Sequence, residues 1–432
     1  MIRFGPAGIP LSCKGRTLRD GIEDVHNLGL NAMEIQLVRV NLVERSATED
    51  EVGLPPREIQ EELIVEIARP KGEKLERITD LDSKIERGDI LHTLLSGLAK
   101  DYKELAQLGR LARDLDVELS LHTPYYMDLV GADDLAKKSM DSMRWGGLIA
   151  QELGARLVVN HLGLYGNVEK KEALRRIAEN LKAVSDWWRL RKLKPLLGIE
   201  TSGRQEVAGT LSEILALCKK VRGVVPVLNF AHVHSREGGI LRRPEDFKAV
   251  LEQAVKASSD RHLHVQFSGV EHQGGNELRY TPIKRGDLRF EPMAEALLGG
   301  SYDMSLISSS PLLEHDAMYM KVILERMMAK TVQKTTRFKP PKEIIPPKKK
   351  RPVEVLPKKL VRKKVAPKPK AKNVKKPKRT APKRVKKTKT AKKRPKKQVA
   401  KRKRLPPRPK PKGKKSQKTK KKPLAKKGRK RR

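Results

Sequence analysis

Short apolar runs rich in β-branched residues recur along the first part of the chain, and each is followed by a longer stretch with apolar positions at helical spacing. The runs predict strands at 2–4, 32–38, 117–122, 156–161, 196–201, 225–229, 262–267 and 304–309. The stretches between them predict helices at 18–28, 100–114, 133–153, 169–190, 210–221, 244–257 and 312–329, with a weaker one near 291–298.

Eight units of a strand and then a helix predict an α/β fold, the (β/α)8 TIM barrel. A doubly wound open sheet is the alternative. Against it, no glycine-rich phosphate loop follows the first strand in the form that such sheets use.

One segment, residues 43–98, departs from the repeat and forms a long insertion after the second strand. Within it, 62–68 and 73–78 are candidates for a hairpin. Loops that follow barrel strands lie on the face that carries the active site. We therefore expect the insertion to lie over the barrel mouth and to contact substrate.

The net charge of +45 comes from one end of the chain. Residues 339–432 hold 47 of the 96 basic residues and, of the 51 acidic ones, only Glu343 and Glu354, so residues 1–338 are electrically balanced. The sequence therefore predicts a neutral barrel domain at 1–338 and a polycationic tail at 339–432.

The tail contains no aromatic residue and many prolines, and in composition it resembles the tails of linker histones. Such a segment buries too little apolar surface to offset its ordering entropy, so we expect it to be disordered. Its Lys and Arg side chains predict salt-dependent binding to DNA that is blind to sequence, with structured RNA as the second candidate.

Other compositional features exclude several classes of protein. Cys13 and Cys218 are the only cysteines, so a disulfide framework or a thiolate zinc site is not expected. No apolar run has membrane-spanning length, the first residues lack a secretory pattern, and no apolar anchor accompanies the tail. We expect a cytoplasmic, nucleoid-associated protein with no membrane partner.

Imidazole and carboxylate side chains gather at the ends of five predicted strands. In chain order they are His122, His161, Glu200, then Asn229 with His232, then His264 with Glu277 in the loop beyond. The carboxyl ends of barrel strands converge on one mouth, so these side chains predict a metal site.

Two positions in this set stay open. In RHLHVQF, His262, His264 and Gln266 share one strand face, and periodicity does not decide which histidine reaches the site. His234 closely follows His232 and is an alternative ligand or a supporting partner.

The local sequences resemble the endonuclease IV family of apurinic/apyrimidinic endonucleases, in particular its archaeal branch, within the xylose-isomerase-like barrels. The matching segments are GLNAMEIQLVR, LSLHTPYYMDL, VVNHLGLYG, GIETSGR, LNFAHVH, HVQFSGVEHQGGNE and SPLLEHDAMYMKVILE. They occur in the family's order and span most of residues 1–330, outside the insertion and the tail.

The resemblance implies hydrolysis of the phosphodiester on the 5′ side of an abasic site by a cluster of three zinc ions. It implies that His122, His161 and Glu200 hold the first metal, with Glu200 as the catalytic carboxylate that bridges to a second. It places His264 at the second metal and His232 at the third. It also places Tyr125 where the family has an aromatic residue that probes the gap left by the missing base.

Three positions depart from the family's pattern. Asn229 stands where the family has an aspartate, Tyr280 where it has a histidine, and Ser309 where it has a glutamate. The second metal site would therefore lack two carboxylate ligands. The third would have His232, with only Glu277 as a possible additional ligand. We therefore expect fewer than three ions, zinc first and manganese second, with the first site intact.

These observations support an AP endonuclease-like deoxyribonuclease of DNA repair that is tethered to DNA by its tail. One alternative is a catalytically weakened, nucleoid-associated barrel that binds DNA without cutting it. A second alternative is a sugar isomerase or epimerase, since related barrels use similar metal sites. The sequence leaves the oligomeric state open.

Overall fold

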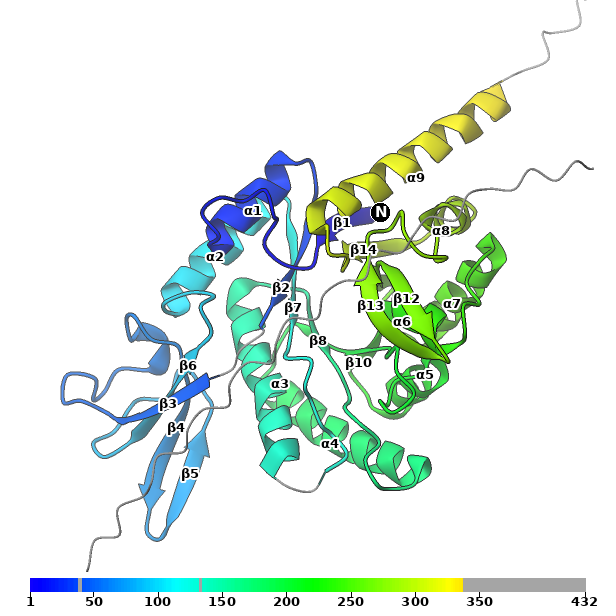
Figure 1. The fold of residues 1–432 in the computed structure, drawn as a ribbon. Helices are drawn as coiled ribbons and strands as arrows, with labels where there is room; N and C mark the ends of the chain where they lie inside the picture. Colours follow the sequence, from blue (N-terminus) through cyan, green and yellow to red (C-terminus); the bar gives the residue numbers. More distant parts are fainter. Residues whose placement is uncertain (38–40, 132–133, 337–432) are drawn as a thin grey trace, which may run out of the picture. The chain divides into compact units, whose positions relative to one another are not determined.

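The computed structural model describes residues 1–37, 41–131 and 134–336, with side chains as far as residue 331. The predicted tail at 339–432 lies outside these residues. In the described part, eight parallel strands lie in the order β1-β14-β11-β10-β9-β8-β7-β2, and a parallel bridge from Ala7 to Glu34 links β1 to β2. The predicted (β/α)8 barrel is therefore confirmed (Figure 1).

Each predicted barrel strand is present. Their bounds are Ile2–Pro6 (β1), Ala32–Gln36 (β2), Glu118–His122 (β7), Leu157–Asn160 (β8), Leu196–Glu200 (β9), Val224–Asn229 (β10), His262–Phe267 (β11) and Asp303–Ser308 (β14). The predicted helices are Leu18–Asn27 (α1), Tyr102–Asp114 (α2), Asp134–Leu153 (α3), Lys170–Leu190 (α4), Leu211–Lys220 (α5), Pro244–Ala257 (α7), Phe290–Leu298 (α8) and Leu313–Thr336 (α9). Within the described residues, no helix is both long enough and apolar enough to cross a membrane.

Local sequence explains where these helices begin and end. Thr210 accepts a hydrogen bond from the Glu213 backbone, and the Glu213 side chain binds back to the Thr210 backbone, which forms a capping box at the start of α5. Pro244 occupies the first turn of α7, where its missing N–H costs nothing. Gly154 follows α3 with a φ of 63°, a conformation that favours glycine at a helix end.

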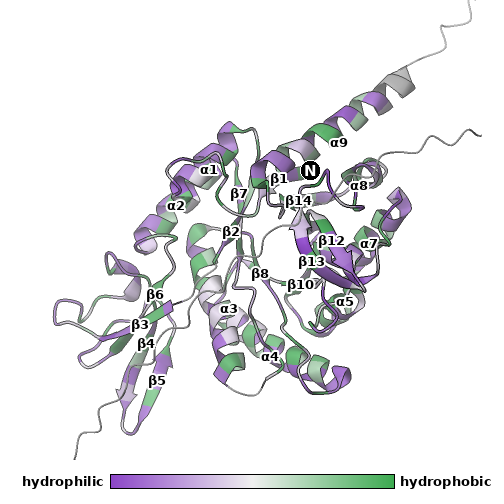
Figure 2. Cartoon of the chain, in the orientation of Figure 1, coloured by the Kyte–Doolittle hydropathy of each residue, from purple (hydrophilic) through white to green (hydrophobic). Residues whose placement is uncertain are grey.

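The barrel interior is apolar on one side and polar on the other. Leu157, Val159, Val225 and Val227 pack together inside β8, β9 and β10. The outward faces of the strands pack on the helices in the main core, so the sheet is buried on both faces. Figure 2 shows that the helices carry hydrophilic and hydrophobic residues in alternating bands, as this packing requires.

The insertion folds as a four-stranded antiparallel sheet of its own. Its strands are Asn41–Ser46 (β3), Ile64–Lys71 (β4), Lys74–Ile78 (β5) and Ile90–Leu95 (β6), in the order β3-β6-β4-β5, with a 3-10 turn at Pro56–Glu58 (η1). The predicted hairpin is confirmed as β4 and β5, which pair in antiparallel register.

The expected position of the insertion over the mouth is wrong. Arg57 and Arg77 form ion pairs with Glu152 and Asp141 of α3, and the Trp187 indole of α4 lies 3.3 Å from the Thr79 hydroxyl. The sheet therefore lies against the outer surface of the helices, and no described residue of 41–98 lines the pocket at the mouth.

The packing of side chains on both sides of β4, which has a register irregularity between Ile64 and Glu66, gives the reason for this position. Leu63 and Val65 join the main core beneath the sheet, whereas Ile64 and Ile67 pack with Leu91 in a separate small core. Both faces of β4 are therefore buried, one by the helices of the barrel and the other by the insertion itself. Burial of the first face requires the sheet to pack on the apolar surface of the helices, and the polar pocket at the mouth offers no such surface.

Two elements near the mouth were not predicted from the sequence. Phe230–Arg236 (α6) follows β10 directly, and Gly269–Gln273 (β12) pairs with Asn276–Thr281 (β13) after β11. The hairpin is largely hydrophilic (Figure 2).

Candidate metal centre

The carboxyl ends of the barrel strands surround a pocket of about 520 Å³. Its polar lining residues are Glu34, Gln36, His122, Tyr125, His161, Glu200, Ser202, Arg204, His232, Gln266, Glu277, Tyr280 and Ser309. A larger depression of about 640 Å³ lies at the opposite end of the barrel beside Arg113, Arg156 and Asp260, and its described lining contains no histidine. The chemistry therefore belongs to the pocket at the mouth.

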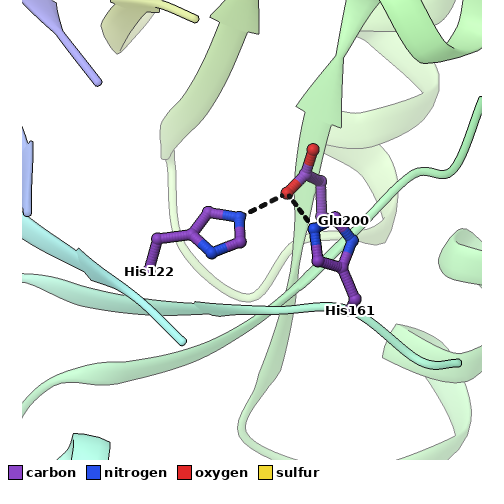
Figure 3. Close-up of side chains that lie close together, drawn as sticks. All are labelled: His122, His161 and Glu200. Carbon is purple, nitrogen blue, oxygen red and sulfur yellow. Dashed lines mark hydrogen bonds and ion pairs between the residues drawn. The ribbon is translucent and has the colours of Figure 1, made fainter. Parts of the chain in front are cut away.

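Three of the predicted ligands meet inside this pocket. His122 ends β7, His161 follows β8, and Glu200 ends β9. The Nε2 atoms of His122 and His161 lie 2.9 Å and 3.7 Å from the same oxygen, Oε2 of Glu200. Their ligand atoms all lie within 4.8 Å of one another, and the side chains point toward one another in Figure 3.

The orientation of the His122 ring fits a metal ligand. Its Nδ1 lies 2.7 Å from the backbone carbonyl of Thr123, which can only accept, so Nδ1 carries a proton. Nε2 is then the atom that faces Glu200. Metal-bound histidines usually donate their second ring nitrogen to a carbonyl or carboxylate in this way.

In the absence of a cation, a protonated histidine balances the charge of the Glu200 carboxylate. Burial opposes a charge on His122, but the hydrogen bond to Glu200 and the charge of Glu34 raise its pKa to about 9. Burial, together with the charge of His122, lowers the pKa of His161 to about 4. Burial opposes the charge of Glu200, yet its histidine partners hold its pKa well below the usual range. A proton on His122 thus stands where a cation would bind.

Asn229 holds Glu200 in place. Its amide NH2 lies 2.9 Å from Glu200 Oε1, 2.9 Å from Gln266 Oε1 and 2.8 Å from the Tyr280 hydroxyl. Its amide oxygen accepts from the backbone N–H groups of Ala231 and His232 and caps α6. In this arrangement Asn229 offers no free oxygen to an ion.

His232 lies on the other side of Glu200, beside Glu277 and Tyr280. Its Nδ1 lies 2.5 Å from the carbonyl of Thr201, so Nε2 faces Glu277 Oε2 at 2.9 Å and the Tyr280 hydroxyl at 2.6 Å. Burial opposes its charge, but Glu200 and Glu277 raise the pKa of His232 to about 10. The structure therefore brings together the residues that the resemblance assigns to a third metal.

His264 lies deeper in the barrel than expected and does not line the pocket. Its Nε2 lies 2.8 Å from Glu34 Oε2 across the barrel. Gln266, two residues further along β11, reaches the pocket instead and donates to Glu34 Oε2 at 3.0 Å.

Glu34 is a site residue that the sequence analysis missed. It is buried in the middle of β2, and it lines the pocket. Burial opposes its charge, but the hydrogen bond from His264 lowers the pKa of Glu34. The sequence signal was a lone carboxylate in the apolar strand AMEIQ, where Ala32, Glu34 and Gln36 share one face.

Tyr125 lies at the exposed rim of the pocket, and Ser309 lines its wall. The Tyr125 side chain is 73% exposed, and its ring lies 5.4 Å from the ring of Tyr126, edge to face. The Ser309 hydroxyl is buried without a hydrogen-bond partner among the described residues.

A second group of possible ligands, His234, His272 and Asp287, joins α6 to the β12–β13 hairpin and the loop after it. The Leu241 backbone N–H donates to His234 Nδ1 at 3.2 Å, so neutral His234 carries its proton on Nε2, 3.1 Å from Asp287 Oδ1. This proton blocks the atom that would bind an ion. His234 therefore faces Asp287 and the ring of His272, and it does not line the pocket at the mouth.

Residues 90–311 match the family described as the xylose isomerase-like TIM barrel. The chain belongs to this barrel family. The match confirms the resemblance at the level of the family and of its fold.

The chain is also similar to individual proteins at low sequence identity. An uncharacterized protein of Methanocaldococcus jannaschii is 26% identical over 230 residues, which are 52% of this chain and 81% of the relative. The crystal structure of a D-tagatose 3-epimerase-like protein has a TM-score of 0.50 and 16% identity, and the match covers 76% of this chain and 99% of that one. Endonuclease IV from Thermus thermophilus has a TM-score of 0.48 and 17% identity over 75% of this chain and 99% of that one. At these identities, structural likeness shows the fold alone.

Proposed function

We propose that this protein is a metal-dependent phosphodiesterase that acts on DNA at abasic sites, as the resemblance to the endonuclease IV family implies. The observation that carries the proposal is the convergence of His122, His161 and Glu200 in a pocket at the barrel mouth. Two imidazoles and a carboxylate with one open position are a ligand set that suits zinc, with manganese as the second candidate.

The residues have separate roles in this proposal. His122, His161 and Glu200 would hold one divalent ion, which supplies a bound water of lowered pKa and neutralises charge on the scissile phosphate. Asn229 orients Glu200 through its 2.9 Å hydrogen bond. Tyr125, exposed at the rim, is positioned to stack on a base or to enter a gap in the DNA.

The tail would keep the enzyme on DNA. Its 47 basic residues attract any nucleic acid, and a nucleoid-associated, cytoplasmic location follows from that attraction. Selectivity for a lesion would then come from the barrel.

One observation favours a second candidate, a barrel that binds DNA without cutting it. Asn229, Gln266, Tyr280 and Ser309 offer no charge to further ions, and the carboxylates of Glu34, Glu200 and Glu277 already have histidine partners. Protonated histidines can therefore balance the carboxylates of this site without any metal ion.

Metal content and cleavage together separate the candidates. The purified full chain should retain about one zinc ion per molecule and cut a duplex at an abasic site. Glu200→Gln should lose both properties, whereas Glu271→Gln, at an exposed glutamate of the hairpin, should keep them. A full chain that holds no zinc after reconstitution and leaves the abasic duplex intact would rule out the enzyme and leave the binding protein.

A further inference from the structure

Arg204 is the single arginine or lysine among the described residues that line the pocket. Its side chain is 56% exposed, and its nearest carboxylate oxygen, on Glu206, lies 3.8 Å away. Glu34, Glu200 and Glu277 line the same pocket, and each is paired with a histidine. Among the described lining residues, Arg204 is therefore the exposed, permanently charged side chain that a phosphate at the pocket could contact.

The loop that carries Arg204, residues 202–208, is held by a buried guanidinium. Arg236 ends α6, and its side chain is buried. It donates to the carbonyl oxygens of Val207 at 2.8 Å and Ser202 at 3.3 Å, and also to the carbonyl of Arg204 itself. A buried charge is costly unless it is hydrogen-bonded, so these bonds fix the loop backbone on α6.

Other contacts hold Arg236 itself and the first residues of the loop. Arg236 also donates to the Tyr165 hydroxyl at 3.1 Å, and that hydroxyl lies 2.8 Å from the Glu213 carboxylate at the start of α5. On the other side, the Glu277 backbone N–H donates to the carbonyl of Gly203 at 2.8 Å. The loop thus forms a rigid support between α5, α6 and the hairpin.

Gly203 shows how closely the loop approaches the site. A Cβ atom at this position would lie 2.6 Å from Glu277 Oε2 and 3.0 Å from the His232 ring. Only glycine leaves room for these two side chains, so the loop backbone forms one wall of the pocket next to Arg204.

We propose that Arg204 determines specificity by contacting a phosphate group of the ligand, and that Arg236 is a positioning residue that acts through the 202–208 loop. The inference rests on the proposed function. It adds that Arg204 recognises the negative charge of a phosphate next to the abasic site. A guanidinium can bind two phosphate oxygens at once, which a single lysine ammonium does less well.

The test compares two duplexes that differ by one charge. Both contain one abasic-site analogue, and in one of them the adjoining phosphodiester is replaced by a neutral methylphosphonate. Dissociation constants are measured for the full chain in a chelator, at about 0.3 M salt to weaken contacts with the tail. The ratio of the two constants is the readout, because it is independent of the folded fraction and of cleavage.

The wild-type chain should prefer the phosphodiester by about tenfold. Arg204→Gln should bring the ratio near one, and Arg204→Lys should restore part of it. Arg236→Gln should also lower the ratio, whereas Arg279→Gln, an exposed arginine of the hairpin outside the pocket, should keep the wild-type value.

Three results would overturn all or part of the inference. A wild-type ratio of one, or an Arg204→Gln ratio equal to wild type, removes the role of Arg204. An Arg236→Gln ratio equal to wild type removes the positioning role. The proposed function fails separately, through absent zinc and absent cleavage, because the binding ratio needs neither.

Discussion

The atoms of His122 and Glu200 show a direct competition between a proton and a cation. Nε2 of His122 faces Oε2 of Glu200 at 2.9 Å, and Nδ1 is committed to the Thr123 carbonyl. Either a proton or a metal ion must lie between Nε2 and the carboxylate, because two electron-rich atoms at that distance repel each other. If this cluster binds a metal ion as proposed, its affinity for the ion is coupled to pH.

We expect the apparent zinc affinity of the full chain to rise with pH between 6 and 9. Because the pKa of His122 is raised to about 9, each bound ion must displace its proton at lower pH. The affinity should increase by about tenfold for each pH unit and level off above the pKa. Competition titrations with a chelator at fixed ionic strength measure this slope. A flat profile would show that no ligand proton is displaced.

Asn229→Asp should make the folded barrel depend on metal. Aspartate keeps the helix cap of α6 but places a carboxylate where the amide now donates to Glu200 at 2.9 Å. We expect the metal-free variant to lose about 2 kcal/mol of stability and zinc to raise its Tm by more than in the wild-type chain.

Adding Ser309→Glu to Asn229→Asp should raise zinc occupancy and abasic-site cleavage further, since it supplies a second carboxylate in the pocket. Thermal unfolding and metal analysis with and without zinc measure these effects. A double variant with wild-type occupancy would argue that the pocket lacks room for another ion.

Among the elements, the insertion is attached to the barrel by polar contacts as well as by its apolar face. Arg77 on β5 contacts the buried carboxylate of Glu66 on β4 and Asp141 on α3. The Tyr102 hydroxyl of α2 donates to the Ile64 carbonyl of β4 at 2.9 Å. These contacts connect the sheet to the helices and not to the pocket, so the insertion contributes to stability.

Arg77→Ala should lower the free energy of unfolding by about 2 kcal/mol, because Glu66 would stay buried without its guanidinium. Arg87→Ala in the same insertion is the matched control, since its ion pair with Glu49 is exposed and should contribute almost nothing. Denaturant unfolding measures both. Zinc affinity should be equal in the two variants, and a loss in Arg77→Ala alone would connect the insertion to the site.

Across the whole molecule, charge and chemistry lie in different parts of the chain. The whole net charge of +45 comes from residues 339–432, whereas the predicted ligands all lie in the barrel. We therefore expect changes in the tail to alter the affinity for nucleic acid, and changes in the barrel to alter the selectivity for a particular site in it.

Removing residues 339–432 should weaken binding to undamaged duplex DNA by at least about a thousandfold at low salt and should flatten its salt dependence. Zinc content of the truncated chain should stay the same, which serves as the control for an intact barrel. Binding isotherms across a range of salt concentrations measure the effect. A truncated chain that binds undamaged duplex as tightly as the full chain would place the DNA contact on the barrel.

The sequence alone predicted the barrel and the three candidate ligands that meet at its mouth. Strands such as 196–201 and helix starts such as Thr210 depend on local patterns of apolar residues and caps, which act over a few residues. Because His122, His161 and Glu200 end or follow strands, their convergence at the mouth followed from the fold class.

The remaining partners depended on how distant strands align. Alternation placed His264 and Gln266 on one face, but it could not tell which of them reaches the pocket, because that depends on the register of β11 against its neighbours. Glu34 reaches His264 from β2, more than two hundred residues away.

The orientation of the Asn229 amide follows from the cap of α6, and the position of the insertion follows from the two buried faces of β4. Spacing along the chain encodes local structure, whereas these contacts join groups that only the closed barrel brings within hydrogen-bonding distance.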